Sequence, residues 1–192
     1  AIETVTLPAS VTSIGASAFA GCSKLRSINL EQITNLGQSA FSQCTALTTA
    51  QLGEGLTRVP ESAFSGCLQL ASVTLPSTVK ELDKEAFYLC TSLQSLTLPE
   101  GLTAIHAGAL LGCPLQALHL PSTLEQMGDE YMGDVFEEAG QTPADTTLTH
   151  ITVAESNPLY SADDGLIYNK AQTELLFCPR GRVTAEVKEG VT

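Results

Sequence analysis

Apolar residues recur along the chain at a fixed period of about 22 to 23 residues, within the range typical of repeat proteins. A cysteine column fixes the phase, and an Ala-Phe column and a leucine column follow it at the same spacing. The cysteines of this column are Cys22, Cys44, Cys67, Cys90 and Cys113. Such self-similarity indicates a repeat architecture, because a single unit of this size cannot bury its own apolar face.

Each repeat predicts two short strands and one helical turn. The alternation at the end of Leu70–Leu75 is typical of a strand with one buried face. The step from Leu98 through Pro99 to Gly101 predicts a turn, and Val11–Gly15 predicts a second extended piece. The Ala-Phe-x-x-Cys spacing favours a helical turn with an apolar inner side. The sequence therefore predicts a right-handed solenoid over residues 1–192, with parallel strands on one face and single-turn helices on another.

Two motifs relate the unit to a known family. Leu-Pro steps occur at residues 7–8, 75–76, 98–99 and 120–121, and the Ala-Phe-x-Gly-Cys element occurs at 18–22 and 63–67. With these motifs the unit resembles the leucine-rich repeat of bacterial surface proteins of the BspA-like, or Treponema pallidum, type. The resemblance implies a leucine-rich repeat superhelix, secretion or surface display, and protein binding. It also implies that residues 151–179 form a variant unit with an inserted hairpin.

The repeat is not uniform to the end of the chain. We expect regular repeats over about 2–135, an acidic helical insertion over about 129–147, a variant repeat with its hairpin over about 148–181, and an incomplete last repeat at 182–192. The pattern at Val187–Thr192 starts another turn without completing it. We therefore expect uncapped solenoid ends that could self-associate, as in a piece of a longer array.

Charge and hydropathy exclude some partners. The chain has 21 acidic and 9 basic residues, a net charge of -12, which repels nucleic acid and anionic lipid headgroups. No apolar run is long enough to predict a membrane span. We expect neither nucleic acid binding nor membrane insertion.

Candidate catalytic chemistry is sparse. The cysteine column lies in an apolar motif, so we expect free, buried thiols rather than disulfides. His106 occupies a repeat position filled elsewhere by Gly15, Gly37, Pro60 and Asp83, which indicates an exposed residue in a turn. No zinc-binding Cys-x-x-Cys pair, phosphate loop or nucleophile elbow occurs. The sequence predicts no enzyme, no cofactor and no catalytic or metal-binding residue.

One polar column on the strand face is a candidate binding surface. Its members carry hydroxyl, amide or imidazole groups and no fixed charge: Thr6, Asn29, Gln51, Thr74, Thr97, His119 and Thr152. Threonine also favours strands for structural reasons, so the column has a structural as well as a functional interpretation.

A second candidate is an acidic patch on the predicted helical insertion. Its residues are Asp129, Glu130, Asp134, Glu137 and Glu138. A docking site for a basic partner is one interpretation and a solvated helix face is the other.

Taken with these features, the resemblance implies a non-catalytic, adhesin-like module that binds an unidentified protein or glycan and belongs to a secreted or cell-surface bacterial protein. A passive spacer for another domain is the alternative.

Overall fold

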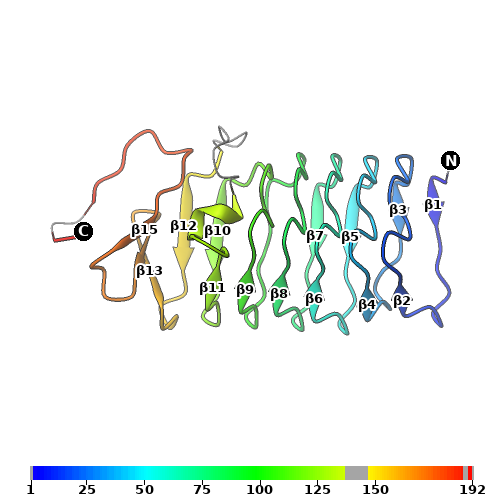
Figure 1. Cartoon of the computed structure of the whole chain (residues 1–192), viewed down its shortest axis with the longest axis horizontal. Coiled ribbons are helices and arrows are strands. Elements are labelled where there is room, and N and C mark those ends of the chain that lie inside the picture. Colours follow the sequence, from blue (N-terminus) through cyan, green and yellow to red (C-terminus); the bar gives the residue numbers. More distant parts are fainter. Residues whose placement is uncertain (1, 137–146, 188–189, 192) are drawn as a thin grey trace.

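The computed structural model describes residues 2–136, 147–187, 190 and 191. The chain forms an elongated stack of rungs, with the N-terminal rung at one end and the C-terminal segment at the other (Figure 1). Each regular repeat contributes one rung, as the period of the sequence predicts.

A first column of short strands follows one side of the stack. The strands are β1 (Thr4–Val5), β3 (Ser27–Ile28), β5 (Thr49–Gln51), β7 (Ser72–Thr74), β10 (Ala117–Leu120) and β12 (His150–Val153). They pair in parallel as β1 with β3, β5 with β7, and β10 with β12. The register places Thr49 opposite Ser72, so residues one repeat apart lie side by side. The rung at 94–98 has no strand, which interrupts this column between β7 and β10.

A second column of strands follows the predicted second extended piece of each repeat. The strands are β2 (Ser13–Ile14), β4 (Asn35–Leu36), β6 (Arg58–Val59), β8 (Glu81–Leu82), β9 (Ala104–Ile105) and β11 (Gln126–Met127). β2 pairs with β4, and β6, β8, β9 and β11 form a continuous parallel sheet in that spatial order. The two strand columns predicted from the repeat are thus both present.

The Ala-Phe-x-x-Cys segments are hydrogen-bonded turns, not the single-turn helices that their spacing predicts. Alternate backbone groups bond in different directions: Ala40 N–H donates within its rung to the Gly37 carbonyl, whereas Phe41 N–H donates to Ala63 of the next rung at 2.8 Å. The residue before the Ala has a positive φ in each regular repeat, for example 54° at Ser62. An α-helix requires right-handed dihedrals and bonds within one segment, so this backbone cannot be helical.

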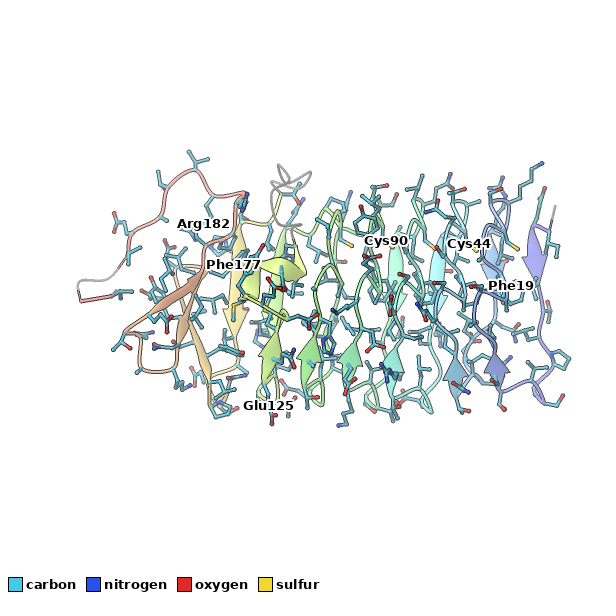
Figure 2. The ribbon with its side chains drawn as sticks, in the orientation of Figure 1. Phe19, Cys44, Cys90, Glu125, Phe177 and Arg182 are labelled. Atoms are coloured by element: carbon cyan, nitrogen blue, oxygen red, sulfur yellow. The ribbon has the colours of Figure 1, made fainter. Side chains whose placement is uncertain are left out.

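The core is a stack of identical side chains contributed by successive rungs. The rings of Phe19, Phe41, Phe64 and Phe87 are nearly parallel, with centroids 5.3 to 5.5 Å apart. All six cysteines are free, and Cys44, Cys67, Cys90 and Cys113 are buried. Figure 2 labels Cys44 and Cys90 of this buried group. The buried thiols donate to phenylalanine carbonyls of the preceding rung, as Cys67 Sγ does to Phe41 at 3.2 Å. The prediction of free, buried thiols is confirmed for these four residues.

The C-terminal part changes from parallel to antiparallel pairing. β13 (Tyr160–Asp163), β14 (Leu166–Asn169) and β15 (Leu175–Phe177) form a three-stranded antiparallel sheet in the segment where the resemblance implied a hairpin. The ring of Phe177 stacks on Phe136 with centroids 5.5 Å apart. Phe136 is the C-cap of the 3-10 helix η1 (Met132–Val135). This contact therefore joins the antiparallel sheet to the last regular rung.

Truncating a ring in the middle of the phenylalanine stack should be costly. Phe64 is fully buried between two other rings, so Phe64→Ala should lower the free energy of unfolding by about 3 to 5 kcal/mol. Thr74→Ser, on the exposed strand face, should change it by less than about 0.5 kcal/mol. Urea denaturation measures both variants, and the reverse order of effects would mean that the inner and outer faces are exchanged.

The buried thiols should make stability fall at alkaline pH. Burial, reinforced by the neighbouring thiols, raises the pKa of Cys44 to about 11 and that of Cys67 to about 12. The unfolded thiol ionises near its ordinary value of 9.0, so these thiols stabilise the fold below that pH, and their contribution is lost as the pH rises through 11 to 12. Cys67→Ala should therefore lose less stability than the unmodified chain when urea midpoints are compared between pH 8 and pH 11. Equal losses would contradict this assignment.

Candidate binding surfaces

The polar column predicted on the strand face lies on the outside of the first strand column. Six of its seven members are exposed: Thr6, Gln51, Thr74, Thr97, His119 and Thr152. The structure brings neighbouring members together, since Gln51 pairs with Thr74 and His119 with Thr152 in the strand registers. The face therefore carries closely spaced polar side chains without fixed charge.

Asn29 differs from the rest of this column because its side chain is used within the fold. Its Oδ1 accepts a hydrogen bond from the backbone N–H of Leu7 at 2.7 Å, and its amide donates to the Leu7 carbonyl at 3.0 Å. The side chain is half-buried. Asn29 thus continues the pairing of the first two rungs beyond β1 and β3, which gives it a structural role that its place in the column did not reveal.

The centre of the column has the most hydrogen-bonding capacity to offer. His119 Nδ1 and Thr152 Oγ1 are already hydrogen-bonded to each other at 2.8 Å. Within the ranges that the structure describes, the side chains of Gln51, Thr74 and Thr97 have no such partner. Three adjacent rungs therefore expose donors and acceptors that only solvent or a ligand can satisfy.

A shallow pocket opens at this place. It has a volume of about 220 Å³ and is lined by Val73, Thr74, Leu75, Thr97 and Pro99. It lies where the first strand column is interrupted, between β7 and the strandless rung at 94–98. Val73 and Leu75 are half-buried there, so the pocket combines apolar walls with two free hydroxyls. This mixture is typical of small binding sites.

The predicted acidic patch is not an exposed helix face. The helix is limited to η1 in the described residues, and Asp134 is buried within it, 8% exposed. Its carboxylate accepts hydrogen bonds from the backbone N–H groups of Asp129 and Glu130, both at 3.0 Å. Glu137 and Glu138 lie outside the described residues. The prediction that Asp134 belongs to an exposed docking patch is therefore wrong, because its carboxylate accepts hydrogen bonds from the loop that precedes the helix.

This loop is built around the Asp134 carboxylate. Gly128 has a φ of +83°, and a Cβ at this position would lie 2.0 Å from the Tyr131 carbonyl and 2.3 Å from Asp134 Oδ1. Only glycine can occupy such a position without displacing its neighbours. In other repeats this position carries the turn that ends a strand. In this repeat Gly128 allows the chain to fold back over the side chain of Asp134.

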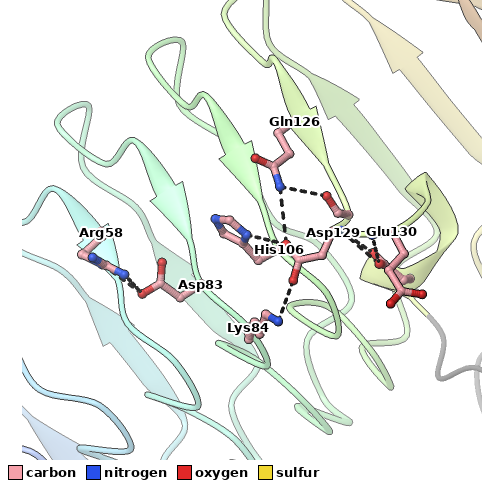
Figure 3. Close-up of polar contacts among 9 residues, drawn as sticks. Arg58, Asp83, Lys84, His106, Gln126, Asp129 and Glu130 are labelled. Carbon is pink, nitrogen blue, oxygen red and sulfur yellow. Dashed lines mark hydrogen bonds and ion pairs between the residues drawn. The ribbon is translucent and has the colours of Figure 1, made fainter.

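A group of charged residues, whose pairing the sequence did not predict, lies along the second strand column (Figure 3). Arg58, at the start of β6, forms an ion pair with Asp83, which follows β8. Asp129 is bonded to two partners, His106 Nδ1 at 2.7 Å and Lys84 Nζ at 3.0 Å. The sequence carries a signal for this group, since Asp83 and His106 occupy the same position in successive repeats and Lys84 and Asp129 share the position that follows.

These contacts shift the pKa values of the charged groups. Partial burial alone would raise the pKa of Asp129, but its hydrogen bonds and charge interactions with His106 and Lys84 outweigh burial and hold that pKa below its usual range. The hydrogen bond to Asp83 raises the pKa of Arg58. Asp129 is thus a paired carboxylate rather than a free charge that could attract a basic partner.

Comparison with known proteins gives the relatives of the chain. The model of the BspA type leucine rich repeat region matches residues 1–35 and 30–135 in six copies. A leucine-rich repeat protein from Bacteroides ovatus is 33% identical over 70% of this chain and 35% of its own, with a TM-score of 0.61. No curated protein is significantly similar in sequence.

Two more distant solved structures cover nearly the whole chain. A leucine rich cell surface protein from Faecalibacterium prausnitzii is 23% identical, covers 93% of this chain and 46% of its own, and has a TM-score of 0.58. A leucine-rich repeat protein from Eubacterium ventriosum is 19% identical, covers 94% of this chain and 42% of its own, and has a TM-score of 0.68. The chain spans less than half the length of each of these three proteins. No helix in the described part of the chain has the length and apolar character needed to cross a membrane.

Removing the carboxylate of Asp134 should unfold the loop that it organises. Asp134→Ala leaves two backbone N–H groups without their acceptor, which should lower the free energy of unfolding by about 1 to 3 kcal/mol. Glu130→Ala removes a neighbouring acidic side chain that is exposed, and should change it by less than about 0.5 kcal/mol. Thermal or urea denaturation compares the two, and equal effects would indicate that Asp134 acts only through its negative charge.

Proposed function

Since the chain belongs to the BspA type leucine rich repeat family, we propose that it is a non-catalytic, adhesin-like interaction module of a secreted or cell-surface bacterial protein. Its ligand would be a protein or a glycan, bound on the outer side of the first strand column. The observation that carries this proposal is the pocket between Thr74 and Thr97, because it joins apolar walls to hydroxyls that no other described side chain contacts by a hydrogen bond.

The chemistry of the face supports a neutral, hydrogen-bonding ligand. Gln51, Thr74 and Thr97 offer donors and acceptors but no fixed charge, which suits hydroxyl-rich glycans and the polar edges of proteins. The rungs hold these groups at fixed spacing, so little side-chain or backbone ordering is needed on binding. A rigid, repetitive polar face is the surface that solenoid proteins commonly use to bind partners.

The acidic side of the molecule is the weaker candidate for docking. Of the three patch residues that the structure describes, Asp129 and Glu130 are exposed, and Asp129 is already paired with Lys84 and His106. A basic partner would have to compete with both of these contacts. The first strand column therefore has the better-founded claim to be the binding surface.

Substitution in the pocket tests the proposal against a passive spacer. The immobilised chain is screened against host extracellular proteins and a glycan array, and retained ligands are tested again with Thr74→Arg and Thr97→Arg. We expect retention to fall at least about tenfold, because an arginine side chain fills the pocket and brings a charge into a neutral site. Thr57→Arg adds the same charge at an exposed position outside the pocket lining and should retain the ligand. Equal retention by all variants, or no ligand in the screen, would favour a spacer.

A further inference from the structure

Three side chains with metal-binding atoms meet on the second strand column. Glu81 begins β8, Asp83 follows it, and His106 follows β9 on the adjacent rung. One donor atom from each lies within 4.8 Å of the other two. The register pairs Glu81 with Ala104 and Leu82 with Ile105, and its continuation sets Asp83 beside His106. The parallel pairing of β8 and β9 thus holds the three residues together.

His106 is oriented in the way that metal-binding histidines are. Its Nδ1 is hydrogen-bonded to the Asp129 carboxylate at 2.7 Å, which leaves Nε2 for another partner. In Figure 3 the second ring nitrogen points away from Asp129, toward the side on which Asp83 lies. A carboxylate on one imidazole nitrogen and a metal ion on the other is the usual arrangement in zinc sites, because the carboxylate fixes the ring and increases its basicity.

Asp83 also has an oxygen to spare. Both nitrogens of Arg58 that contact it bind the same atom, Oδ2, so Oδ1 stays outside the ion pair. The residue is buried, 7% exposed, and its position is fixed by Arg58. Glu81 is half-buried and has no hydrogen-bonding partner in the described structure, so its carboxylate can turn toward a cation.

We propose that Glu81, Asp83 and His106 bind a zinc ion, with Asp129 as the positioning residue of His106. One imidazole and two carboxylates are ligands that zinc accepts, whereas magnesium and calcium are bound through oxygen alone. Glu61 and Lys84 line the same pocket as Glu81, Asp83 and Arg58, so three carboxylates outnumber two cationic side chains there and attract a divalent cation. The residues line a pocket of about 320 Å³, which leaves room for water as the fourth ligand.

The site cannot be predicted from local spacing, because its imidazole ligand is far from its two carboxylates in the chain. His106 comes a full repeat after Asp83, and Asp129 comes a further repeat after His106. Metal motifs are usually recognised from close spacing, such as two ligands on one helical turn or in one loop. Here the register of the solenoid brings the ligands close together. The proposed site replaces the expectation from the sequence that the chain has no metal-binding residue.

Zinc titration followed by calorimetry tests the site. Cys178 is exposed and thiols bind zinc, so the titration uses the Cys178→Ser chain as background. We expect one zinc ion per chain, with at least tenfold weaker binding for His106→Gln. His150→Gln changes an exposed histidine in β12, on the other strand column, and should leave zinc binding unchanged. Asp129→Asn should weaken binding about 10- to 100-fold, as the loss of an outer carboxylate does in other zinc sites.

Each result of these titrations either supports the zinc site or contradicts it. Loss of zinc binding in His106→Gln and Glu81→Gln, with retention in His150→Gln, supports the site. Equal binding by His106→Gln and His150→Gln, or no binding by the background chain up to about 1 mM zinc, overturns it. Circular dichroism identifies a variant that does not fold, and Glu81→Gln then provides the test, because this side chain has no hydrogen bond to lose within the described residues.

Discussion

The fold depends on the fact that a rung can bury its side chains only against the next rung. A repeat of this length has too few apolar groups to enclose a core of its own. Stacking solves this for every rung at once: the phenylalanine rings lie on one another at 5.3 to 5.5 Å, and the buried thiols donate to carbonyls of the preceding rung. The period varies only between 22 and 23 residues from Phe19 to Phe87, and every ring stays in its column.

This constraint turns distance in the sequence into proximity in space. Residues one repeat apart become neighbours, so a function can be built from side chains that no local motif would connect. Thr74 and Thr97 line one pocket, and Asp83, His106 and Asp129 follow one another along the second strand column. The interior is nearly the same in every rung, and the differences between rungs are therefore concentrated on the outside.

The repeat predicted the architecture correctly, and the predictions that were wrong have local physical causes. The two strand columns and the buried Phe64 and Cys67 follow from the period alone, since every rung must present the same residues inward. The predicted helical turns are wrong because amides such as that of Phe41 bond to the next rung, which a single repeat read in isolation cannot show. Asp134 is buried because two backbone N–H groups of its own loop bind it. The pairing of His106 with Asp129 does not follow from the period, because Asp129 occupies the next position of the following repeat.

The two proposed sites lie on different strand columns but involve the same pair of rungs. One rung carries Thr74 and Asp83, and the next carries Thr97 and His106. On the first column these rungs lack strand pairing, and the pocket opens between them; on the second column they are paired through β8 and β9. A zinc ion bound by Asp83 and His106 would tie the two rungs together at their paired side and so limit how far they can separate at the pocket. Metal and ligand would then be coupled through the spacing of two rungs, without any contact between them.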